Sequence, residues 1–439
     1  MNILVKFILT CVISGLSLSF AGKAQAISIL RDAEMEYAMD VLARPILQAA
    51  GLPAAQYQIF IVDDSSLNAF VFSGKYIFIH KGLIQRIERP DMLQAVLAHE
   101  TAHLAAQHSV TRSLALGGAK RGAAAGLVLA ALVEILSNGD SDGAGVGLAL
   151  GTQSAAQRGF FGHTRGEETI ADEWGAQYLR RAGVPLKGIV DVMRIFEGQE
   201  ALSHQHQDAY TRTHPLSRDR VTRMLALSDS LGDAAENSPT AIYWFDRLRA
   251  ALRAYDRQTL PIGLQPDAEA LYNAMRAHRA GQTDKAITLA RQVLARRPND
   301  ALIHARLGEF YLVAGRASEA LRSYEQALAH DRDSLILHGA GRAAFAAGRP
   351  KSALKYFQAA SKDDWFNARL LQDMSLAYGQ LGQTGLAALY SAERYAVQGR
   401  AKDAVIQAKQ AQNRLSKGSP AWHRAQDILD LNKEIQKKK

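Results

Sequence analysis

The segment His99-Glu100-Thr101-Ala102-His103 has the residue types and spacing of a metal-dependent hydrolase. On an α-helix, side chains four residues apart point the same way, so the two imidazoles can bind one metal ion. A glutamate directly after the first histidine is what a zinc peptidase requires in addition. A buried histidine pair held by ordinary hydrogen bonds is the alternative. We favour the metal site because Glu100 is present and an acidic motif follows downstream.

That acidic motif, residues 165–172, is predicted to supply a third ligand from a second helix. A catalytic zinc site needs three protein ligands and one position for water. Glu168 and Asp172 lie one helical turn apart, so Glu168 can bind the metal while Asp172 accepts a hydrogen bond from a ligand imidazole. The adjacent Glu167 is a rival ligand, but it points about 100° away from Glu168 around the helix. Surface salt bridging is the alternative for such a cluster.

The elements before and around the histidine pair indicate a small α+β domain. The helix that carries the pair is apolar on nearly all sides, so we expect it to be buried, to begin after Pro90-Asp91 and to run past His108. A helical pattern covers residues 27–50. Three β-like runs follow at residues 57–62, 68–73 and 76–80, with Gly74 joining the last two, which predicts a small sheet.

The first 26 residues are typical of a cleaved export signal. Lys6 precedes an uncharged apolar run over residues 7–20, and Ala24-Gln25-Ala26 has the small-x-small pattern of a cleavage site. A retained membrane anchor is the alternative, but the run is shorter than the roughly 20 residues that a bilayer core requires. The sole cysteine, Cys11, lies in this segment, so the mature chain would have neither a disulfide nor a zinc–cysteine site.

Composition favours a globular protein without a nucleic-acid partner. The chain has 439 residues, of which 48% are hydrophobic and 22% charged, and its net charge is +9. The basic residues are spread along amphipathic helices and not interleaved with aromatics, which indicates a solvated surface. Two apolar segments, 122–136 and 144–156, are each too short to span a bilayer. They are expected to form a helical hairpin that packs over the site or makes peripheral contact with a membrane.

The second half of the chain is repetitive. Gly281, Gly315, Gly348 and Gly382 recur every 33 or 34 residues, and an alanine follows each at the same distance, which is the period of tetratricopeptide helix pairs. One copy is nearly complete, with Leu307, Gly308, Tyr311, Ala320, Tyr324 and Ala327 at packing positions. A further helix pair around Ala404 and a last helix from Pro420 are expected. Stacked repeats should form a curved scaffold that holds a protein partner or the catalytic half.

Together these segments resemble the CAAX-prenyl-endopeptidase and HtpX superfamily of metallopeptidases, and within it the exported BepA-like proteases that carry tetratricopeptide repeats. The resemblance covers nearly the whole mature chain. It depends on the order and spacing of several motifs, namely Arg31-Asp32-Ala33-Glu34, Asn68-Ala69-Phe70 with Gly74, His99-Glu100-x-x-His103 with His108, Arg165-x-x-Glu168-x-x-Ala171-Asp172, and His214-Pro215 with Arg220.

The resemblance implies one zinc ion held by His99, His103 and Glu168, with Asp172 bonded to a ligand. Glu100 would take a proton from the attacking water and pass it to the leaving amine. The family pattern also implies that His214 and Arg220 support the oxyanion, and that His214 can occupy the fourth zinc position in a resting form. Asn68, Ala69 and Phe70 on the edge strand would hold the substrate as an added strand.

We therefore expect a mainly α protein with three parts: an export signal at 1–26, an α+β zinc metallopeptidase domain at 27–255, and an all-α tetratricopeptide solenoid at 256–439. The leading hypothesis is a periplasmic endopeptidase that cleaves unfolded or misassembled envelope proteins, with the repeats binding a substrate or an assembly partner. The alternative is a repeat-based assembly chaperone with secondary proteolysis. A hydrolase of small molecules is disfavoured, because an edge strand and a repeat array suit polymers.

Overall fold

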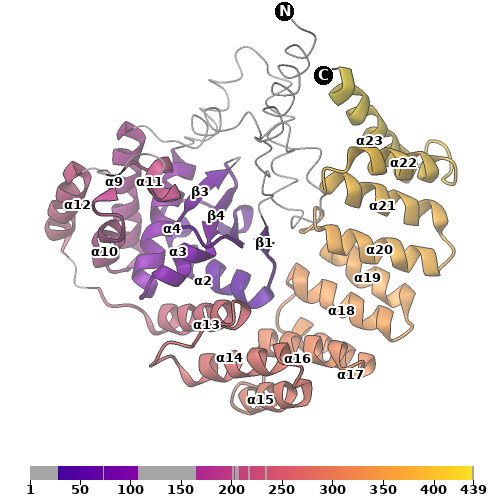
Figure 1. Cartoon of the computed structure of the whole chain (residues 1–439), viewed down its shortest axis with the longest axis horizontal. Helices are drawn as coiled ribbons and strands as arrows, with labels where there is room; N and C mark the ends of the chain where they lie inside the picture. Colours follow the sequence, from indigo (N-terminus) through magenta and orange to yellow (C-terminus); the bar gives the residue numbers. More distant parts are fainter. Residues whose placement is uncertain are drawn as a thin grey trace, which may run out of the picture.

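The computed structural model describes residues 28–72, 74–106, 165–199, 202, 207–215, 218–232 and 235–437. The expected export signal, His108 and the apolar segments between 122 and 156 lie outside the described residues. Within the described ranges, no helix is both long enough and apolar enough to cross a membrane. The mainly α class is confirmed, with one small sheet in the first half and stacked helix pairs in the second (Figure 1).

The sheet has four strands in the order β1-β2-β4-β3, formed by Ile29–Leu30, Gln58–Val62, Tyr76–His80 and Ala69–Phe72 in that order. β2 and β4 are parallel, whereas β1 and β3 run antiparallel to their neighbours. The three predicted β-runs are confirmed, and Gly74 has a φ of 65° in the turn between β3 and β4, a left-handed conformation that glycine adopts without steric cost. Within the described part of the chain, β3 has a neighbour on one side only.

The prediction of a helix from residue 27 was wrong at its start. Ile29 and Leu30 pair with Val62 and Ile61 of β2 as strand β1, and both side chains are buried. The helix α2 spans Ala33–Ala49, and the Asp32 carboxylate caps it by accepting hydrogen bonds from the backbone N–H groups of Glu34 and Met35. Helical periodicity did not reveal this boundary, because two buried residues in sequence fit a strand and a helix equally well.

Helix α4, Pro90–Ala105, is the central helix of the catalytic half, and nearly all of its residues are buried, as predicted. It ends at Ala105, so the prediction that it runs past His108 was wrong. Around it lie α2, α9, α10 and strand β3. The remaining elements of this half are η1 (Ala54–Gln56), α3 (Lys81–Arg86), α9 (Arg165–Ala182), α10 (Lys187–Ile195), α11 (Ala209–Thr213), α12 (Arg218–Leu231) and α13 (Pro239–Tyr255).

Two glycines let neighbouring helices approach α4 closely. A Cβ atom at Gly188 of α10 would lie 2.4 Å from the backbone oxygen of Asp91, which no real side chain tolerates. A Cβ atom at Gly175 of α9 would lie 3.3 Å from the backbone of Ala98 and His99. The second contact matters for the site, because it holds α9 against the turn of α4 that carries the first histidine.

Over residues 266–397 the repeat region forms the helix pairs that the sequence period predicts. Beyond them, one helix around Ala404 and the last helix from Pro420 form a single further pair, where a pair followed by a separate last helix was expected. The pairs are α14 (Pro266–Arg279) with α15 (Thr283–Arg296), α16 (Ala301–Val313) with α17 (Ala317–Leu328), α18 (Ser334–Ala346) with α19 (Pro350–Ala360), α20 (Ala368–Gln380) with α21 (Thr384–Val397), and α22 (Ala401–Gln412) with α23 (Pro420–Lys437). In the most regular pair, Gly308 leaves room for the Tyr324 ring, whose atoms would lie 2.7 Å from an added Cβ. The solenoid prediction is confirmed.

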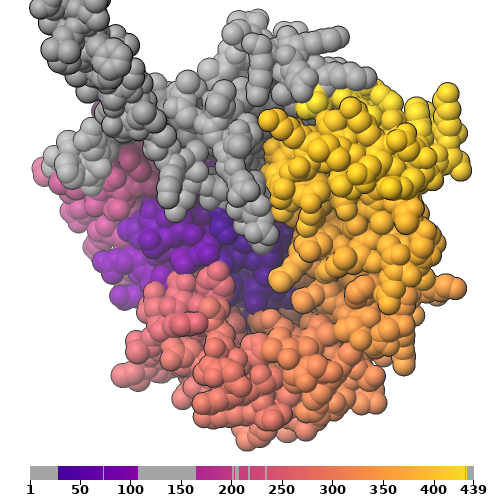
Figure 2. Space-filling view, turned by 45° about the vertical axis from the view of Figure 1, so that its right-hand side comes forward, coloured from indigo at the N-terminus to yellow at the C-terminus, as the bar shows by residue number. Residues whose placement is uncertain are grey.

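The solenoid curves from α13 around to the outer face of the catalytic sheet (Figure 1). Phe366, Leu371 and Val397 of the repeats share one apolar cluster with sheet residues such as Phe60 and Phe78. The space-filling view shows orange repeat residues next to indigo residues of the catalytic half (Figure 2). The other face of the sheet packs against the helices of the catalytic core through residues such as Ala69, Val71, Ile77 and Ile79.

A buried ion network joins the two halves where the solenoid begins. The Arg247 guanidinium on α13 donates to both carboxylate oxygens of Glu34 on α2, and it also bonds to Asp300, which caps α16. The side chains of Arg247 and Glu34 are each only 1% exposed. Burial raises the pKa of Glu34, although the Arg247 charge opposes that shift. The buried carboxylate of Glu34 can therefore stay ionised only with Arg247 beside it.

We expect Arg247→Met to destabilise the protein by about 3–5 kcal/mol, because it leaves two carboxylates without their partner while nearly conserving the volume. The measurement is thermal or urea unfolding followed by circular dichroism, with an expected fall in Tm of about 10 °C. Arg296→Met is the matched control, because Arg296 pairs with Asp267 on the surface and its side chain is 51% exposed. Equal effects of the two substitutions would contradict the importance of burial.

Candidate metal centre

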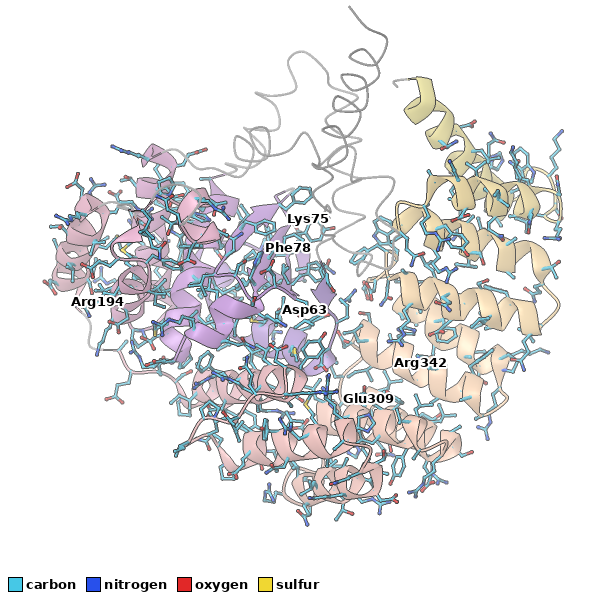
Figure 3. The ribbon with its side chains drawn as sticks, viewed as in Figure 1. Asp63, Lys75, Phe78, Arg194, Glu309 and Arg342 are labelled. Carbon is cyan, nitrogen blue, oxygen red and sulfur yellow. The ribbon has the colours of Figure 1, made fainter. Side chains whose placement is uncertain are left out.

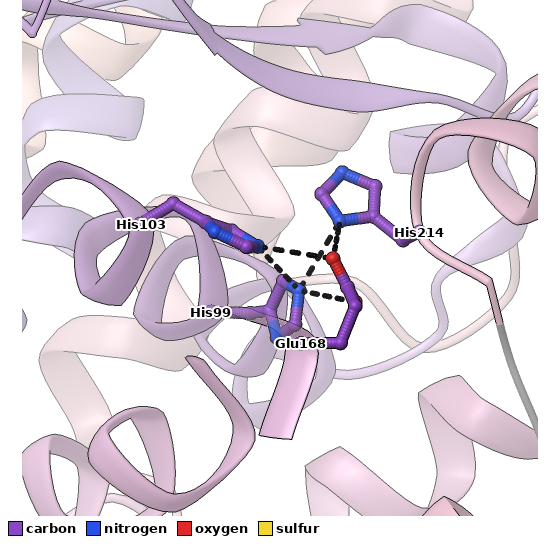
Figure 4. Close-up of side chains that lie close together, drawn as sticks. All are labelled: His99, His103, Glu168 and His214. Atoms are coloured by element: carbon purple, nitrogen blue, oxygen red, sulfur yellow. Dashed lines mark hydrogen bonds and ion pairs between the residues drawn. The ribbon is translucent and has the colours of Figure 1, made fainter. Parts of the chain in front are cut away.

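Four buried side chains from three separate segments converge beside α4. His99 and His103 come from α4, Glu168 from the first turns of α9, and His214 from the residue that follows α11. One ligand-type atom from each lies within 4.8 Å of the other three. Figure 4 shows the two imidazoles of α4 facing Glu168, with the His214 ring opposite them. The structure thus brings together the three predicted ligands and His214.

The separations within the group are short and similar. His99 Nε2 lies 3.1 Å from His103 Nε2, 3.3 Å from His214 Nδ1 and 3.3 Å from Glu168 Oε2. Glu168 Oε1 lies 3.0 Å from His214 Nδ1 and 3.4 Å from His103 Nε2. Nitrogen and carboxylate oxygen atoms are the donors that a zinc-type cation binds.

Asp172 and Arg220 flank the group on the side of α9. Asp172 Oδ1 lies 3.2 Å from His99 Nδ1, so a neutral His99 that donates its Nδ1–H there presents the Nε2 lone pair to the group. The Arg220 guanidinium makes two 2.8 Å hydrogen bonds to Asp172 and an ion pair of 2.8 Å with Glu168. It also donates to the backbone oxygen of Pro215 at 2.7 Å. Arg220 therefore holds the two carboxylates and the segment of His214 together.

Glu100 lies in the same interior without a hydrogen bond. Its side chain is 0% exposed, and within the described part of the chain neither carboxylate oxygen has a hydrogen-bond partner. His214 contacts it, with Nε2 at 3.4 Å from Glu100 Oε1. Burial raises the pKa of Glu100. A buried carboxylate without a hydrogen bond is costly, which indicates that a water molecule or another ligand belongs beside it.

The electrostatics of the group favour a cation. Burial opposes a charge on His99, but Glu168 and Asp172 outweigh it and raise the pKa of His99 to about 10. Burial also disfavours ionisation of Glu168, yet its interactions with the His214 and His99 imidazoles lower its pKa well below the usual value. The pKa of His103 is lowered by burial. A metal ion would supply the positive charge that these carboxylates attract, and the residues present fit one.

An aromatic stack that the sequence did not reveal holds His214. The His214 ring stacks on Tyr210 at 4.6 Å between ring centroids, and Tyr210 stacks on Phe196 at 4.7 Å. Burial and the nearby carboxylates raise the pKa of Tyr210 well above its usual value, so the phenol stays neutral. Tyr210 lies four residues before the His-Pro motif, and this spacing of about one helical turn is the sequence signal that could have indicated the contact.

The same segment covers the start of strand β3. The backbone N–H of Tyr210 donates to Leu67 O at 2.9 Å, and His214 Nε2 lies 3.2 Å from Ala69 O. The backbone oxygen of Asn68 accepts a hydrogen bond from His80 N of β4 instead. The backbone oxygens of Leu67 and Ala69 therefore point away from β4, to the open side of the strand. Thr213 Oγ1 also donates to the Asn68 side chain. In this structure the residues from Tyr210 to His214 occupy part of the edge to which a substrate strand would add.

Comparison with known proteins decides the class of the catalytic half. The model of peptidase family M48 matches residues 30–228, and a tetratricopeptide-repeat model matches residues 277–343. Residues 30–228 are a peptidase family M48 domain. M48 peptidases depend on a metal, so the protein is a metallopeptidase, and the four converging side chains belong to the M48 domain.

Two relatives with known names match most of the chain, and a third matches a short part of it. The chain is 23% identical to the beta-barrel assembly-enhancing protease of Escherichia coli K12 over 423 residues, which covers 93% of this chain and 85% of that protein. It is 24% identical to the protein of that name from Yersinia pestis over 335 residues, 72% of this chain and 66% of that protein. A shorter match, 37% identical over 76 residues, links 17% of the chain to 22% of the mitochondrial metalloendopeptidase OMA1 of Schizosaccharomyces pombe.

Proposed function

We propose that this protein is a zinc-dependent endopeptidase that is exported to the periplasm and cleaves unfolded or misassembled envelope proteins, while its solenoid binds the substrate or an assembly partner. The observation that carries the proposal is the buried group His99, His103, Glu168 and His214 beside the carboxylate of Glu100, whose oxygens have no hydrogen-bond partner in the described part of the chain. The export signal expected at 1–26 supports the location. The names of the E. coli and Yersinia relatives support a role in β-barrel assembly.

Zinc is the metal that the donor set favours. Two imidazoles and one carboxylate, with a fourth position that water can take, are a common ligand set of catalytic zinc. Two ligand atoms bound at about 2.0–2.1 Å to a tetrahedral ion lie about 3.3 Å apart. The Nε2 atoms of His99 and His103 are 3.1 Å apart, and they lie 3.3 and 3.4 Å from the two different oxygens of Glu168, which is close to that value.

Each residue of the site then has a task. A metal ion held by His99, His103 and Glu168 would supply Lewis acidity, which lowers the pKa of the attacking water and polarises the peptide carbonyl. Glu100 accepts the proton from that water and passes it to the leaving amine nitrogen. Asp172 accepts the Nδ1–H of His99 and so keeps Nε2 free as a ligand atom. Arg220 acts as a positioning residue in this form, because its hydrogen bonds go to Asp172, Glu168 and Pro215.

His214 has two proposed roles, one in each of two forms of the enzyme. In the form described here, a neutral ring that donates Nε2–H to Ala69 O presents its Nδ1 lone pair to the metal position. It would then exclude water from the fourth ligand position and hold a closed resting form. Once the ring leaves this position, His214 is near enough to support the oxyanion of the transition state.

The substrate is proposed to bind as a strand beside β3. Asn68 precedes this strand, and Ala69 and Phe70 begin it. The backbone oxygens of Leu67 and Ala69 on the open side are bonded by the segment of Tyr210 and His214. Displacing that segment would free the strand edge and the fourth ligand position together. An extended polypeptide can then form backbone hydrogen bonds with β3, which selects unfolded chains over folded ones.

Metal removal tests the proposed function. We expect the purified protein to contain one zinc ion per chain by mass spectrometry, and to cleave unfolded β-casein. Dialysis against 1,10-phenanthroline should lower the cleavage rate by at least about 10²-fold, since the water loses its activating ion, and stoichiometric zinc should restore it. Protein that stays metal-free after zinc addition, or full cleavage without metal, would overturn the proposal.

Asp172→Asn should weaken zinc affinity about 10–100-fold, because the amide accepts a weaker hydrogen bond from His99 and loses its charge pairing with Arg220. The measurement is competition with a fluorescent zinc chelator, and cleavage should return at high zinc. Asp219→Asn is the control, because Asp219 lies in the first turn of α12 and is exposed. An affinity equal to that of the wild type would remove Asp172 from its proposed role.

An assembly chaperone with secondary proteolysis is the alternative function. The solenoid supports it, because its inner side faces the catalytic half and carries charged side chains such as Glu309 and Arg342 (Figure 3). The two functions separate in cells of the source organism that lack the gene. Rescue of envelope defects by a chain with intact repeats and the Glu100→Gln substitution would favour the chaperone, whereas failure of rescue would favour the protease.

A further inference from the structure

The segment Arg31-Asp32-Ala33-Glu34 lies at the start of the catalytic half, yet its charged side chains bind the solenoid. Arg31 donates two 3.0 Å hydrogen bonds to the carboxylate of Asp364, in the loop between α19 and α20. Asp32 accepts two from Arg306 of α16, at 2.9 and 2.7 Å. Glu34 pairs with Arg247 of α13. Arg31 and Asp32 therefore meet two different parts of the repeat half, and Glu34 meets α13, the helix that precedes the repeats.

Of these contacts, the one between Arg31 and Asp364 lies farthest along the solenoid from its beginning. Asp364 is only 2% exposed, and Asn367 donates a 2.8 Å hydrogen bond to it. Phe366, also 2% exposed, packs in the apolar cluster on the outer face of the sheet. The Arg31 guanidinium lies 5.6 Å from the ring centroid of Phe60 on β2 and 5.9 Å from that of Phe366. Charge and apolar packing together dock this loop on the sheet.

The solenoid is consequently attached at two places. Near its beginning, Arg306 of α16 binds Asp32, the N-cap of α2, and the preceding helix α13 binds α2 through Arg247. Further along, the α19–α20 loop binds Arg31 and the sheet. Between the two attachments, the inner side with Glu309 and Arg342 faces the catalytic half (Figure 3). Strand β2 lies two strands from β3, a distance of about 10 Å, which an extended polypeptide covers in about three residues.

We propose that Arg31 is a positioning residue for long substrates. It holds the α19–α20 loop on the catalytic sheet, so that the inner side of the solenoid and the edge of β3 form one continuous surface for an extended polypeptide. A short peptide fills only the edge strand and does not need this alignment. The proposal rests on the proposed endopeptidase function and adds how the enzyme distinguishes a long unfolded chain from a short peptide.

The test compares two substrates in steady-state kinetics with zinc-loaded full-length protein. One is β-casein, and the other is an internally quenched peptide of about eight residues taken from a mapped casein cleavage site. We expect Arg31→Ala to raise KM for casein about tenfold, the loss of one good contact, with kcat kept within about twofold. For the peptide, kcat/KM should stay within about twofold of the wild-type value.

Two further variants make the result specific. Asp364→Asn keeps the shape of the loop but removes its charge, so it should raise KM for casein in the same direction by a smaller factor. If the Arg31→Ala variant does not fold, Asp364→Asn replaces it in the test, with the same outcomes for casein and peptide. Arg424→Ala breaks a comparable pair with Glu393 between α21 and α23, and it should leave both substrates unaffected. The variant with both Arg31→Ala and Asp364→Ala should be no worse than Arg31→Ala alone.

The possible outcomes are distinguishable. A higher KM for casein with unchanged peptide cleavage supports the positioning role. Equal losses for casein and peptide, or no loss for either, overturn it. If the wild-type protein cleaves neither substrate, the proposed function fails, independently of Arg31.

Discussion

Replacing Glu100 with glutamine is expected to lower kcat for unfolded protein substrates by about 10²–10⁴-fold while zinc stays bound. Glu100 is completely buried, its carboxylate oxygens have no hydrogen-bond partner in the described part of the chain, and the adjacent His99 faces the ligand group. The amide of glutamine has nearly the same shape but cannot take a proton from water. Since Glu100 is not one of the grouped ligand atoms, metal content should stay at one per chain.

The measurement combines cleavage of β-casein with zinc analysis and thermal unfolding of the same preparations. Glu173→Gln is a suitable control, because Glu173 lies on α9 near the site but is exposed. Removing the buried charge of Glu100 should leave Tm equal to the wild-type value or raise it, since the neutral amide is less costly to bury. Unchanged cleavage by the Glu100→Gln variant would exclude this residue as the general base.

The part of the site that local periodicity controls could be predicted from the sequence. His99 and His103 are one turn apart on α4, and Glu168 and Asp172 are one turn apart on α9, so each pair shares a face whatever the rest of the fold does. The preference for Glu168 over Glu167 followed from the same geometry. In the structure Glu168 is completely buried among the imidazoles and Glu167 is not.

Features that depend on contacts between distant segments could not be predicted in this way. Nothing in the residues around Arg220 indicates that its guanidinium binds Asp172 and Glu168, which lie 48 and 52 positions away in the chain. The stack of Phe196, Tyr210 and His214 requires α10 and α11 to meet.

Arg31 illustrates the same limit over a longer range. The motif that contains it was visible in the sequence, but its partner Asp364 lies 333 positions away. A repeat period predicts that helices stack, but it does not predict where the end of the stack returns to the catalytic half. The boundary of β1 escaped prediction for a related reason, because a two-residue strand depends on its partner β2 more than on its own pattern.

Replacing His214 with alanine is expected to lower the apparent KM for casein about tenfold and to leave zinc content unchanged. In the present form, His214 Nδ1 lies among the ligand atoms and its Nε2 contacts Ala69 O on the strand edge. A segment that occupies both places competes with the substrate, so the apparent affinity is reduced by the fraction of molecules that are open. Removing the imidazole should shift this equilibrium towards the open form. His423→Ala, which changes an exposed histidine on α23, is the control.

The two roles proposed for His214 affect different kinetic constants, which lets one experiment separate them. If His214 competes with the substrate, its loss lowers KM and leaves kcat unchanged, whereas loss of oxyanion support lowers kcat. A variant with lower KM and a kcat reduced by more than about tenfold would show both roles, and a reduced kcat with unchanged KM would show oxyanion support alone. If both constants equal those of the wild type, neither role survives. The contact with Ala69 O would then serve only to pack α11 against the sheet.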